Sequence, residues 1–318
     1  MLSYRPFLNG DIPSIVAIWK NHGPDPALAK EISADLFDRL VLSKLYFDRR
    51  GLIMAVDDAQ IVGFVHAGFG PNEDETELDT TRGVVSLLLT HADQSDSTIA
   101  DGLLAQAEAY LVDRGAQTIA AIGLGELCPF YLGLYGSCDL PGIFDSDTHR
   151  TDFFKRHNYQ PDAQIFCFRK EISDYRPTTN RTNIRLRRSL NIEFVSDPSA
   201  RSWWDACTQG CLPQLSATAR SVGAHEVFAK ALFWDMQTIT GPKSRRSMGL
   251  SRLNVTDPAA PPGTGSYLLE ESFKQLQQQG IQHVLAQCDK EDSDRRMLLE
   301  GAGMEHYDTG TLWNKRVS

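Results

Sequence analysis

Apolar residues recur at helical spacing in the second half of the chain. Leu269, Phe273 and Leu276 are spaced i, i+4, i+7, which is the apolar stripe of a helix that packs on a sheet. Short apolar runs at 249–255 and 283–288 lie before and after this stripe and predict buried strands. The order strand, loop, helix, strand predicts a β-α-β unit, whose strands are nearly always parallel.

The first half opens with a different set of predicted elements. Residues 2–7 form an expected strand. An apolar stripe of helical period then begins at Ile12 and predicts a helix, with Asp11 as its N-cap. Two further apolar runs at 52–56 and 61–67 are separated by a short polar turn and predict a β-hairpin.

A long internal repeat connects the two halves. With a shift of 165 positions (280 minus 115), residues 115–121 fall on 280–286 without a gap, and Leu103 falls on Leu268. Equivalent residues therefore recur in the helix, turn and strand of both halves. We expect the two halves to share one fold of the α/β class with a mixed sheet.

The length of 318 residues fits two domains of ordinary size. The polar stretch 174–183 lacks periodicity and is the expected linker. It divides the chain into a first domain over residues 1–173 and a second domain over residues 184–318. The acidic stretch 73–77 is interpreted as a solvated loop.

Composition narrows the classes of function. The formal net charge of −9 argues against non-specific nucleic-acid binding, which needs a basic surface. No apolar run reaches the roughly 18 residues of a membrane helix, and the N-terminus is too short and polar for a secretion signal, so we expect a cytoplasmic protein. The six cysteines form no C-x-x-C pair and no cluster with zinc spacing, so no metal is expected.

The loop with the strongest chemical signal follows the predicted strand 249–255. It contains Gly263 and Gly265 directly before the predicted helix. A loop of this kind exposes backbone N–H groups at a helix N-terminus, where the helix dipole adds partial positive charge. Pyrophosphate can bind there without a basic side chain, and glycine lets the backbone approach the phosphates closely.

This region resembles the GNAT superfamily of N-acetyltransferases. The family has a strand, then Arg/Gln-x-x-Gly-x-Gly/Ala, then a helix. The chain reads Ala260-Pro261-Pro262-Gly263-Thr264-Gly265, with Ala260 in place of Arg/Gln. A later family segment, Asn-x-x-Ala-x-x-x-Tyr-x-x-x-Gly-Phe, resembles residues 292–304, where Leu299 replaces the tyrosine. The first half resembles the family more weakly, in its opening elements and at 151–159. The two-domain layout is similar to that of mycothiol synthase, a tandem member whose C-terminal half does the chemistry.

The resemblance implies direct transfer of an acetyl group from acetyl-CoA to a primary amine of a small molecule or peptide. Tyr307 is the expected acid, and Asp235 or Glu226 is the expected base. The family pattern assigns acetyl-CoA binding to a larger set of residues. These are Leu253, Asn254, Val255, Ala260, Pro261, Pro262, Gly263, Thr264, Gly265, Ser266, Asp292 and Arg295.

The first half carries a degenerate version of the loop. Residues 95–100 contain no glycine, and Asp93 and Asp96 would repel pyrophosphate. We therefore expect tight acyl-CoA binding in the second half. The aromatic segment 126–136, an insertion relative to the second half, is interpreted either as a wall of an acceptor pocket or as an ordered loop that fills core or interface. The competing interpretation of the whole chain is a non-catalytic acyl-CoA sensor or scaffold.

Overall fold

The computed structural model describes residues 1–22, 28, 32–91, 97–123, 128–134, 138–177, 180–223, 226–240, 245–256 and 260–317. Its strands are β1 Ser3–Pro6, β2 Leu52–Asp57, β3 Gln60–Pro71, β4 Leu78–Thr90, β5 Thr118–Ala121, β6 Ile143–Phe144, β7 Gln160–Glu171, β8 Leu190–Ser196, β9 Gln214–Ser221, β10 Val227–Asp235, β11 Ser247–Val255, β12 His283–Asp289 and β13 Glu305–Arg316. Its helices are α1 Ile12–Asn21, α2 Ala34–Phe37, α3 Ser97–Asp113, α4 Thr148–Arg156, α5 Arg181–Ser189, α6 Trp203–Gln209, α7 Gln237–Thr240, α8 Thr264–Gln278 and α9 Ser293–Gly301. A 3-10 turn, Asn9–Asp11, precedes α1, and a π-helical turn, Asp38–Leu42, follows α2.

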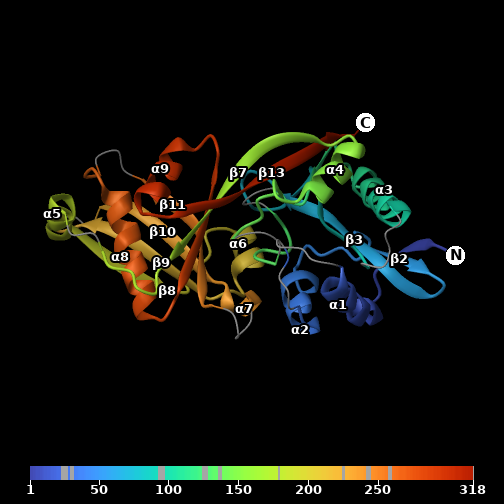
Figure 1. Cartoon of the computed structure of the whole chain (residues 1–318), viewed down its shortest axis with the longest axis horizontal. Helices are drawn as coiled ribbons and strands as arrows, with labels where there is room; N and C mark the ends of the chain where they lie inside the picture. The colour runs from blue at the N-terminus through green and yellow to red at the C-terminus, as the bar shows by residue number, and fades with distance from the viewer. Residues whose placement is uncertain are drawn as a thin grey trace.

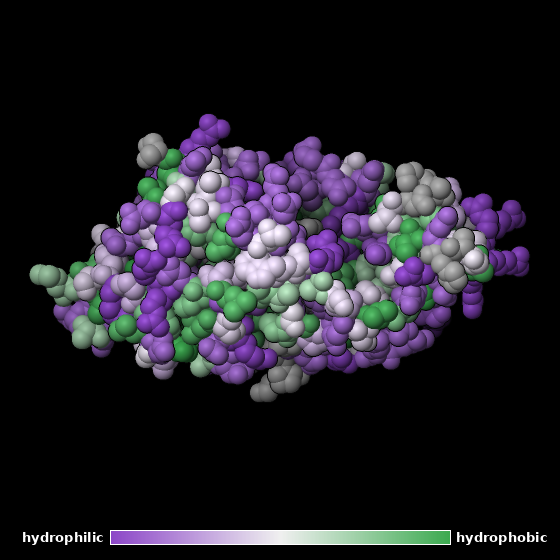
Figure 2. All heavy atoms as spheres, turned by 180° about the vertical axis from the view of Figure 1, so that it is seen from behind, coloured by the Kyte–Doolittle hydropathy of each residue, from purple (hydrophilic) through white to green (hydrophobic). Residues whose placement is uncertain are grey.

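One continuous mixed sheet runs through the molecule (Figure 1). Its strand order is β1-β2-β3-β4-β5-β13-β7-β12-β11-β10-β9-β8, and β6 pairs with β13 beside this path. The α/β class with a mixed sheet is therefore confirmed. No helix in the described ranges is long and apolar enough to cross a membrane. On the face seen in Figure 2, hydrophobic residues form separate patches among hydrophilic ones.

The internal repeat is confirmed at the level of strand register. β4 pairs in parallel with β5 through Arg82 opposite Thr118, and β11 pairs in parallel with β12 through Ser247 opposite His283. Both residues of the second pair lie 165 positions (247 minus 82) after those of the first. Because helix α8 also follows α3 at this shift, the two β-α-β units correspond element by element.

Each half gives its last long strand to the other half. β7 of the first half pairs with β12 of the second, and β13 of the second half pairs with β5 of the first. The two exchanged strands also pair with each other, antiparallel, at the centre of the sheet. They cross between the halves in Figure 1. Each of the segments 1–173 and 184–318 therefore contributes one strand to the other, and the division into two domains at these bounds stays a prediction.

The expected linker is shorter than the polar stretch 174–183. Helix α5 begins at Arg181, because the side chain of Asn180 accepts a hydrogen bond from the Asn183 backbone N–H at 2.7 Å and caps the helix. Tyr175 packs edge-on against Phe273 of α8 at 5.6 Å between ring centroids. The polar composition of the stretch hid both the helix start and this contact.

The described part of the aromatic segment 126–136 fills core and interface, which is one of its two interpretations. Residues 126–127 and 135–136 lie outside the described ranges. In the described part, Phe130, Tyr131 and Leu134 are buried in the first-half core. The same core contains Trp234 of the second half, whose indole N–H donates to the Cys138 carbonyl at 3.0 Å. The insertion therefore packs between the two halves, and its residues 128–132 also line a small cavity of about 20 Å³ there. A role as the wall of an acceptor pocket stays a prediction.

The exchanged strands predict that the halves fold only together. A fragment of residues 1–177 loses β13 from the edge of β5 and both neighbours of β7, which leaves unpaired strand edges. We expect this fragment and residues 178–318 to aggregate or self-associate when expressed separately. When expressed together, they should form a soluble one-to-one complex. Size-exclusion chromatography and circular dichroism provide the measurement, and a folded monomer of residues 1–177 would contradict the expectation.

Candidate functional site

The paired parallel strands of each half separate at the same place. β4 and β5 pair only as far as Val85 opposite Ala121, although β4 continues to Thr90. In the second half, β11 continues to Val255 after the last pair with β12. Beyond these pairs, the sheet opens a gap between adjacent strands in each half. We call each gap a splay.

A one-residue bulge marks the start of each splay. Ser86 is the extra residue of β4 against β3, and Ser251 is the extra residue of β11 against β10. Bulges bend a strand and are common beside active sites. The Ser251 hydroxyl donates to the Leu232 carbonyl at 3.2 Å. Both halves therefore retain the same local distortion at the site where a ligand would enter.

The first-half splay contains a cavity of about 430 Å³. This volume is within the range of small-molecule sites. The N-terminal turns of α3 and α4 both reach it, so two positive helix-dipole ends face the same space. The lining residues are His22, Leu88, Leu89, Thr90, Ala100, Ile122, Ser146, Asp147, Thr148, His149, Arg150, Phe153 and Phe154.

An ion pair fixes the first turn of α4 beside this cavity. The Asp147 carboxylate caps the helix by accepting from the Arg150 backbone N–H at 2.9 Å. Its second oxygen lies 2.5 Å from a guanidinium nitrogen of Arg150. Both side chains are largely buried, at 13% and 15% exposure. Sequence analysis missed these two residues. A shift of 145 positions (292 minus 147) maps them onto Asp292 and Arg295, and this shift is the signal that would have found them.

The second-half loop lies at the N-terminus of α8, as predicted. Gly263 has a φ of +89°, a conformation that side chains with a Cβ rarely adopt. A Cβ added at Gly265 would lie 2.9 Å from the side chain of Leu298. The second glycine therefore has a packing role: it permits close contact between α8 and α9. Residues 257–259 of this loop lie outside the described ranges.

Side chains of the second half occupy its own splay. Asp292 caps α9 by accepting from the Arg295 backbone N–H at 2.9 Å. The Arg295 guanidinium donates to the Ser251 carbonyl at 3.3 Å, at the start of the splay. Leu298 reaches Gly265 across the same space. The structure thus brings the predicted residues of the α8 loop and of α9 together, but around protein side chains.

The strand residues predicted to bind the cofactor point in different directions. Leu253 is buried in the second-half core, whereas Asn254 lines a separate cavity on the sheet. Val255 is 45% exposed and lies near the Gly265 position. Of these three residues, Val255 alone is placed beside the glycine loop.

The two predicted catalytic residues do not share a site. Asp235 ends β10, and Tyr307 lies on β13, with β11, β12 and β7 between them. Four strand spacings of about 4.8 Å separate them by roughly 19 Å across the sheet. Tyr307 packs against Phe144, at 6.5 Å between ring centroids. Glu226 is exposed and directly precedes β10. Each role stays a prediction, but Asp235 and Tyr307 cannot act on one substrate together in this arrangement.

No protein-family model and no curated protein sequence matches the chain. Solved structures do match over its whole length. One is a GCN5-related glucosamine N-acetyltransferase region of a fungal multi-domain GH3 β-N-acetylglucosaminidase, with a TM-score of 0.72 and 16% identity. The match covers 99% of this chain and 38% of that chain, so our chain spans well under half of the fungal protein.

Two further structures match along nearly their full length. A tandem GNAT protein from the clavulanic acid biosynthesis pathway has a TM-score of 0.69 and 12% identity, with 99% and 98% of the two chains covered. A GCN5-related N-acetyltransferase from Sphaerobacter thermophilus has a TM-score of 0.63 and 15% identity, with 99% and 95% covered. The chain therefore has the tandem GNAT fold. The closer likeness to mycothiol synthase stays an expectation.

The backbone of the α8 loop gives a stability prediction. Gly263→Ala forces a Cβ into a positive-φ position and should lower the free energy of unfolding by about 1–2 kcal/mol. Gly301→Ala is the matched control, because a Cβ there meets no atom within 4 Å, and it should be neutral or stabilising. Urea unfolding of both variants provides the comparison. Equal stability of the two variants would contradict the strained geometry.

Proposed function

We propose that the chain is an N-acetyltransferase that transfers the acetyl group of acetyl-CoA to a primary amine of a small molecule or peptide. The observation that carries the proposal is the first-half cavity, which lies at a strand splay, faces two helix N-termini and belongs to a tandem GNAT fold. Glucosamine is the first acceptor to test, because the fungal neighbour is described as a glucosamine N-acetyltransferase.

The first-half cavity offers groups that suit both the acyl end and the phosphates of acetyl-CoA. Leu88, Leu89 and Phe153 supply apolar walls. The N-termini of α3 and α4 supply partial positive charge for phosphates, which must outweigh the Asp147 carboxylate at α4 and the repulsion expected from Asp93 and Asp96 before α3. The open edge of β4 beyond Val85 offers backbone N–H groups to a developing oxyanion. When bound, acetyl-CoA supplies the activated acyl group. The protein's own task is then to orient the amine and to accept its proton.

His22 is the residue of this cavity that we propose as the general base. Its Nδ1 lies 2.5 Å from the Trp19 carbonyl oxygen. Because a carbonyl only accepts hydrogen bonds, Nδ1 carries the proton, and Nε2 is the basic nitrogen of the neutral ring. His22 also lines the cavity, but its Nε2 is buried, so ligand binding must expose this nitrogen before it accepts a proton.

The two halves offer different arguments for the cofactor site. The second half has the glycine loop, and its assignment as the tight site stays the prediction of the sequence. The first half has the cavity, whereas Arg295 and Leu298 occupy the second-half splay. We therefore place the reaction in the first half. The filled second-half splay also favours the alternative of a half that only binds or supports, as in a sensor or scaffold.

A pair of carboxylate substitutions tests which half binds the cofactor. Ala100→Glu puts a negative charge in the first-half cavity, and Gly263→Glu puts one at the matched loop of the second half. Losing two charge-assisted contacts weakens binding by roughly two to four orders of magnitude. We expect this loss in calorimetric titration of Ala100→Glu with acetyl-CoA and little change in Gly263→Glu. The reverse pattern would move the site to the second half.

Measurement of turnover tests the proposed role of His22 as the general base. His22→Gln should lower kcat with an accepted amine by about 10²-fold or more, while acetyl-CoA affinity stays close to that of the unaltered protein. His306→Gln is the control, because His306 is exposed on β13 and lies outside the cavity lining. Release of free CoA thiol provides the measurement. If no member of a broad amine panel is acetylated while acetyl-CoA still binds, the sensor or scaffold alternative holds.

A further inference from the structure

A second cavity, of about 640 Å³, lies on the face of the second-half sheet. Its floor is formed by β9, β10 and β11. Its wall is formed by α6 and the preceding segment 197–201. This cavity is separate from the first-half splay and shares no lining residue with it. Nothing in the proposed acetyl transfer requires it.

The internal repeat shows that this floor is polar where the equivalent first-half surface is apolar. Two rows of paired residues cross the three floor strands. In the second half the rows are Thr218–Lys230–Asn254 and Ser216–Leu232–Arg252. In the first half the equivalent rows are Met54–Phe64–Leu89 and Leu52–His66–Leu87, all of them buried. One half thus has a packed core at the place where the other has hydrogen-bonding side chains.

The cover over the two surfaces differs in the same way. In the first half, residues 7–51 connect β1 to β2 and supply α1 and α2, which pack on the sheet. In the second half, the shorter connection 197–213 supplies α6 alone. A shortened connection leaves part of the sheet face uncovered. Polar replacements on that face keep it wettable, and they also line a concave space of ligand size.

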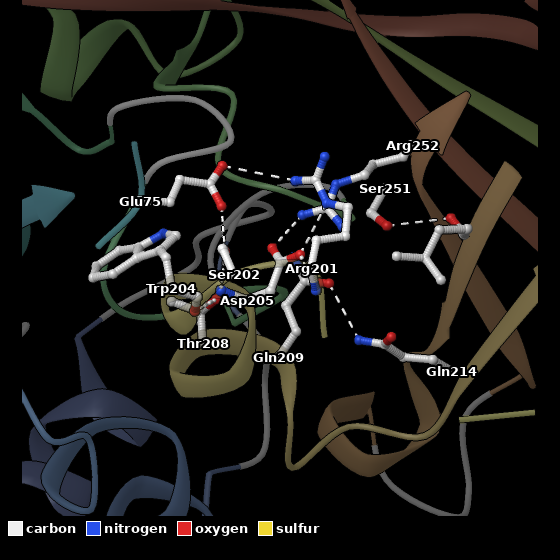
Figure 3. Close-up of polar contacts among 11 residues, drawn as sticks. Glu75, Arg201, Ser202, Trp204, Asp205, Thr208, Gln209, Gln214, Ser251 and Arg252 are labelled. Atoms are coloured by element: carbon white, nitrogen blue, oxygen red, sulfur yellow. Dashed lines mark hydrogen bonds and ion pairs between the residues drawn. The ribbon is translucent and has the colours of Figure 1, made fainter. Parts of the chain in front are cut away.

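Contacts from the first half hold α6 in place over the cavity (Figure 3). Glu75 accepts a short hydrogen bond from the Ser202 hydroxyl and lies 3.7 Å from the Arg201 guanidinium. The expectation that residues 73–77 form a solvated loop is therefore wrong for Glu75. At the other end of α6, the buried Lys44 ammonium donates to the carbonyls of Cys207 and Thr208 at 2.8 and 2.9 Å. The wall of the cavity is thus clamped at both ends.

Asp205 of α6 closes a charge network at the cavity. It accepts from Arg201 at 3.0 Å and pairs with Arg252 of β11. Burial alone would raise the pKa of Asp205, but hydrogen bonds from Arg252 and Arg201 outweigh burial and hold that pKa below its usual value. Asp205 therefore stays ionised and fixes both guanidinium groups at the rim. Because these two arginines neutralise the Asp205 carboxylate, it does not attract a cationic ligand.

Lys230 is the cation of the lining that is left for an anion. Four cationic side chains and two carboxylates line the cavity. Arg201 and Arg252 pair with Asp205, and the second carboxylate, Asp197, accepts from the Gln214 backbone N–H at 2.9 Å. Arg220 is paired with Glu193 at 2.9 Å, outside the lining. Within the described ranges, Lys230 makes no ion pair, and it lies between Thr218 and Asn254 in one row. An ammonium group flanked by a hydroxyl and an amide can bind an anionic group with hydrogen-bonding neighbours.

We propose that this cavity is a binding site for a small polar organic anion, with a carboxylate or phosphate group placed at Lys230. The hydroxyl and amide side chains of the same floor bind the polar remainder of the ligand. This inference does not rest on acetyl transfer, because it uses neither the splay nor an acyl group.

Calorimetric titration without any CoA compound tests the proposal. The probes are glycerol 3-phosphate, malate, glycerol and putrescine, at low ionic strength. We expect at least one of the two anions to bind, and binding by only one identifies the group as phosphate or carboxylate. Lys230→Leu should weaken that binding by roughly tenfold to a hundredfold, the effect of losing one charge-assisted contact. Lys230→Glu should abolish it.

Matched controls separate this site from the acetyl-transfer site. Lys20→Leu removes the same charge from the exposed end of α1 and should leave anion binding unchanged. Lys230→Glu should retain the affinity for acetyl-CoA, and circular dichroism should show an unchanged melting temperature. The proposal is overturned if neither anion binds at millimolar concentration. It is also overturned if glycerol or putrescine binds as tightly as the anions, or if the Lys230 variants bind the anion as the unaltered protein does.

Discussion

The antiparallel pairing of β7 with β13 is the interaction on which the rest of the structure depends. Each of these strands belongs to one half of the chain but completes the sheet of the other half. Their pairing runs through Gly310 opposite Ile165, and the registers on either side of this pair mirror each other. The duplicated halves are therefore related by an approximate two-fold axis at this point. Because both splays open next to the exchanged strands, the position of each candidate ligand site is set by both halves.

The two halves differ in their side chains but keep the same backbone arrangement in the sheet. Backbone register at the parallel pairs is identical after the shift of 165 positions, so the sheet positions equivalent side chains alike. Side-chain identity then decides what each site is. Ala100 and Phe153 border an open cavity in the first half, whereas their equivalents Gly265 and Leu298 meet each other in the second. Because Gly265 is smaller than Ala100, α8 and α9 approach each other closely and fill the space that stays open as a cavity in the first half.

Contacts between the halves come from both sides. The buried insertion places Cys138 and Asp139 against the second half, where Asp139 donates its backbone N–H to Gln287 at 2.6 Å. In the opposite direction, Lys44 and Glu75 of the first half hold α6 of the second. A buried lysine is costly to desolvate, and burial lowers the pKa of Lys44, but two helix carbonyls compensate for the lost water. These contacts join the two halves, and those to α6 hold the wall of the second cavity.

The sequence by itself determined the two β-α-β units, the repeat and the fold class. The stripe Leu269, Phe273 and Leu276 predicts α8, and the gapless match predicts two equivalent β-α-β units, because helical period and strand alternation are local properties of the chain. Only the tertiary structure decided which strand pairs with which and which splay is open. The exchange of β7 and β13 leaves no local signal, since either partner presents the same backbone groups. The position of Arg295 on the Ser251 carbonyl, and the polar floor that includes Lys230, also depend on residues brought together from distant parts of the chain.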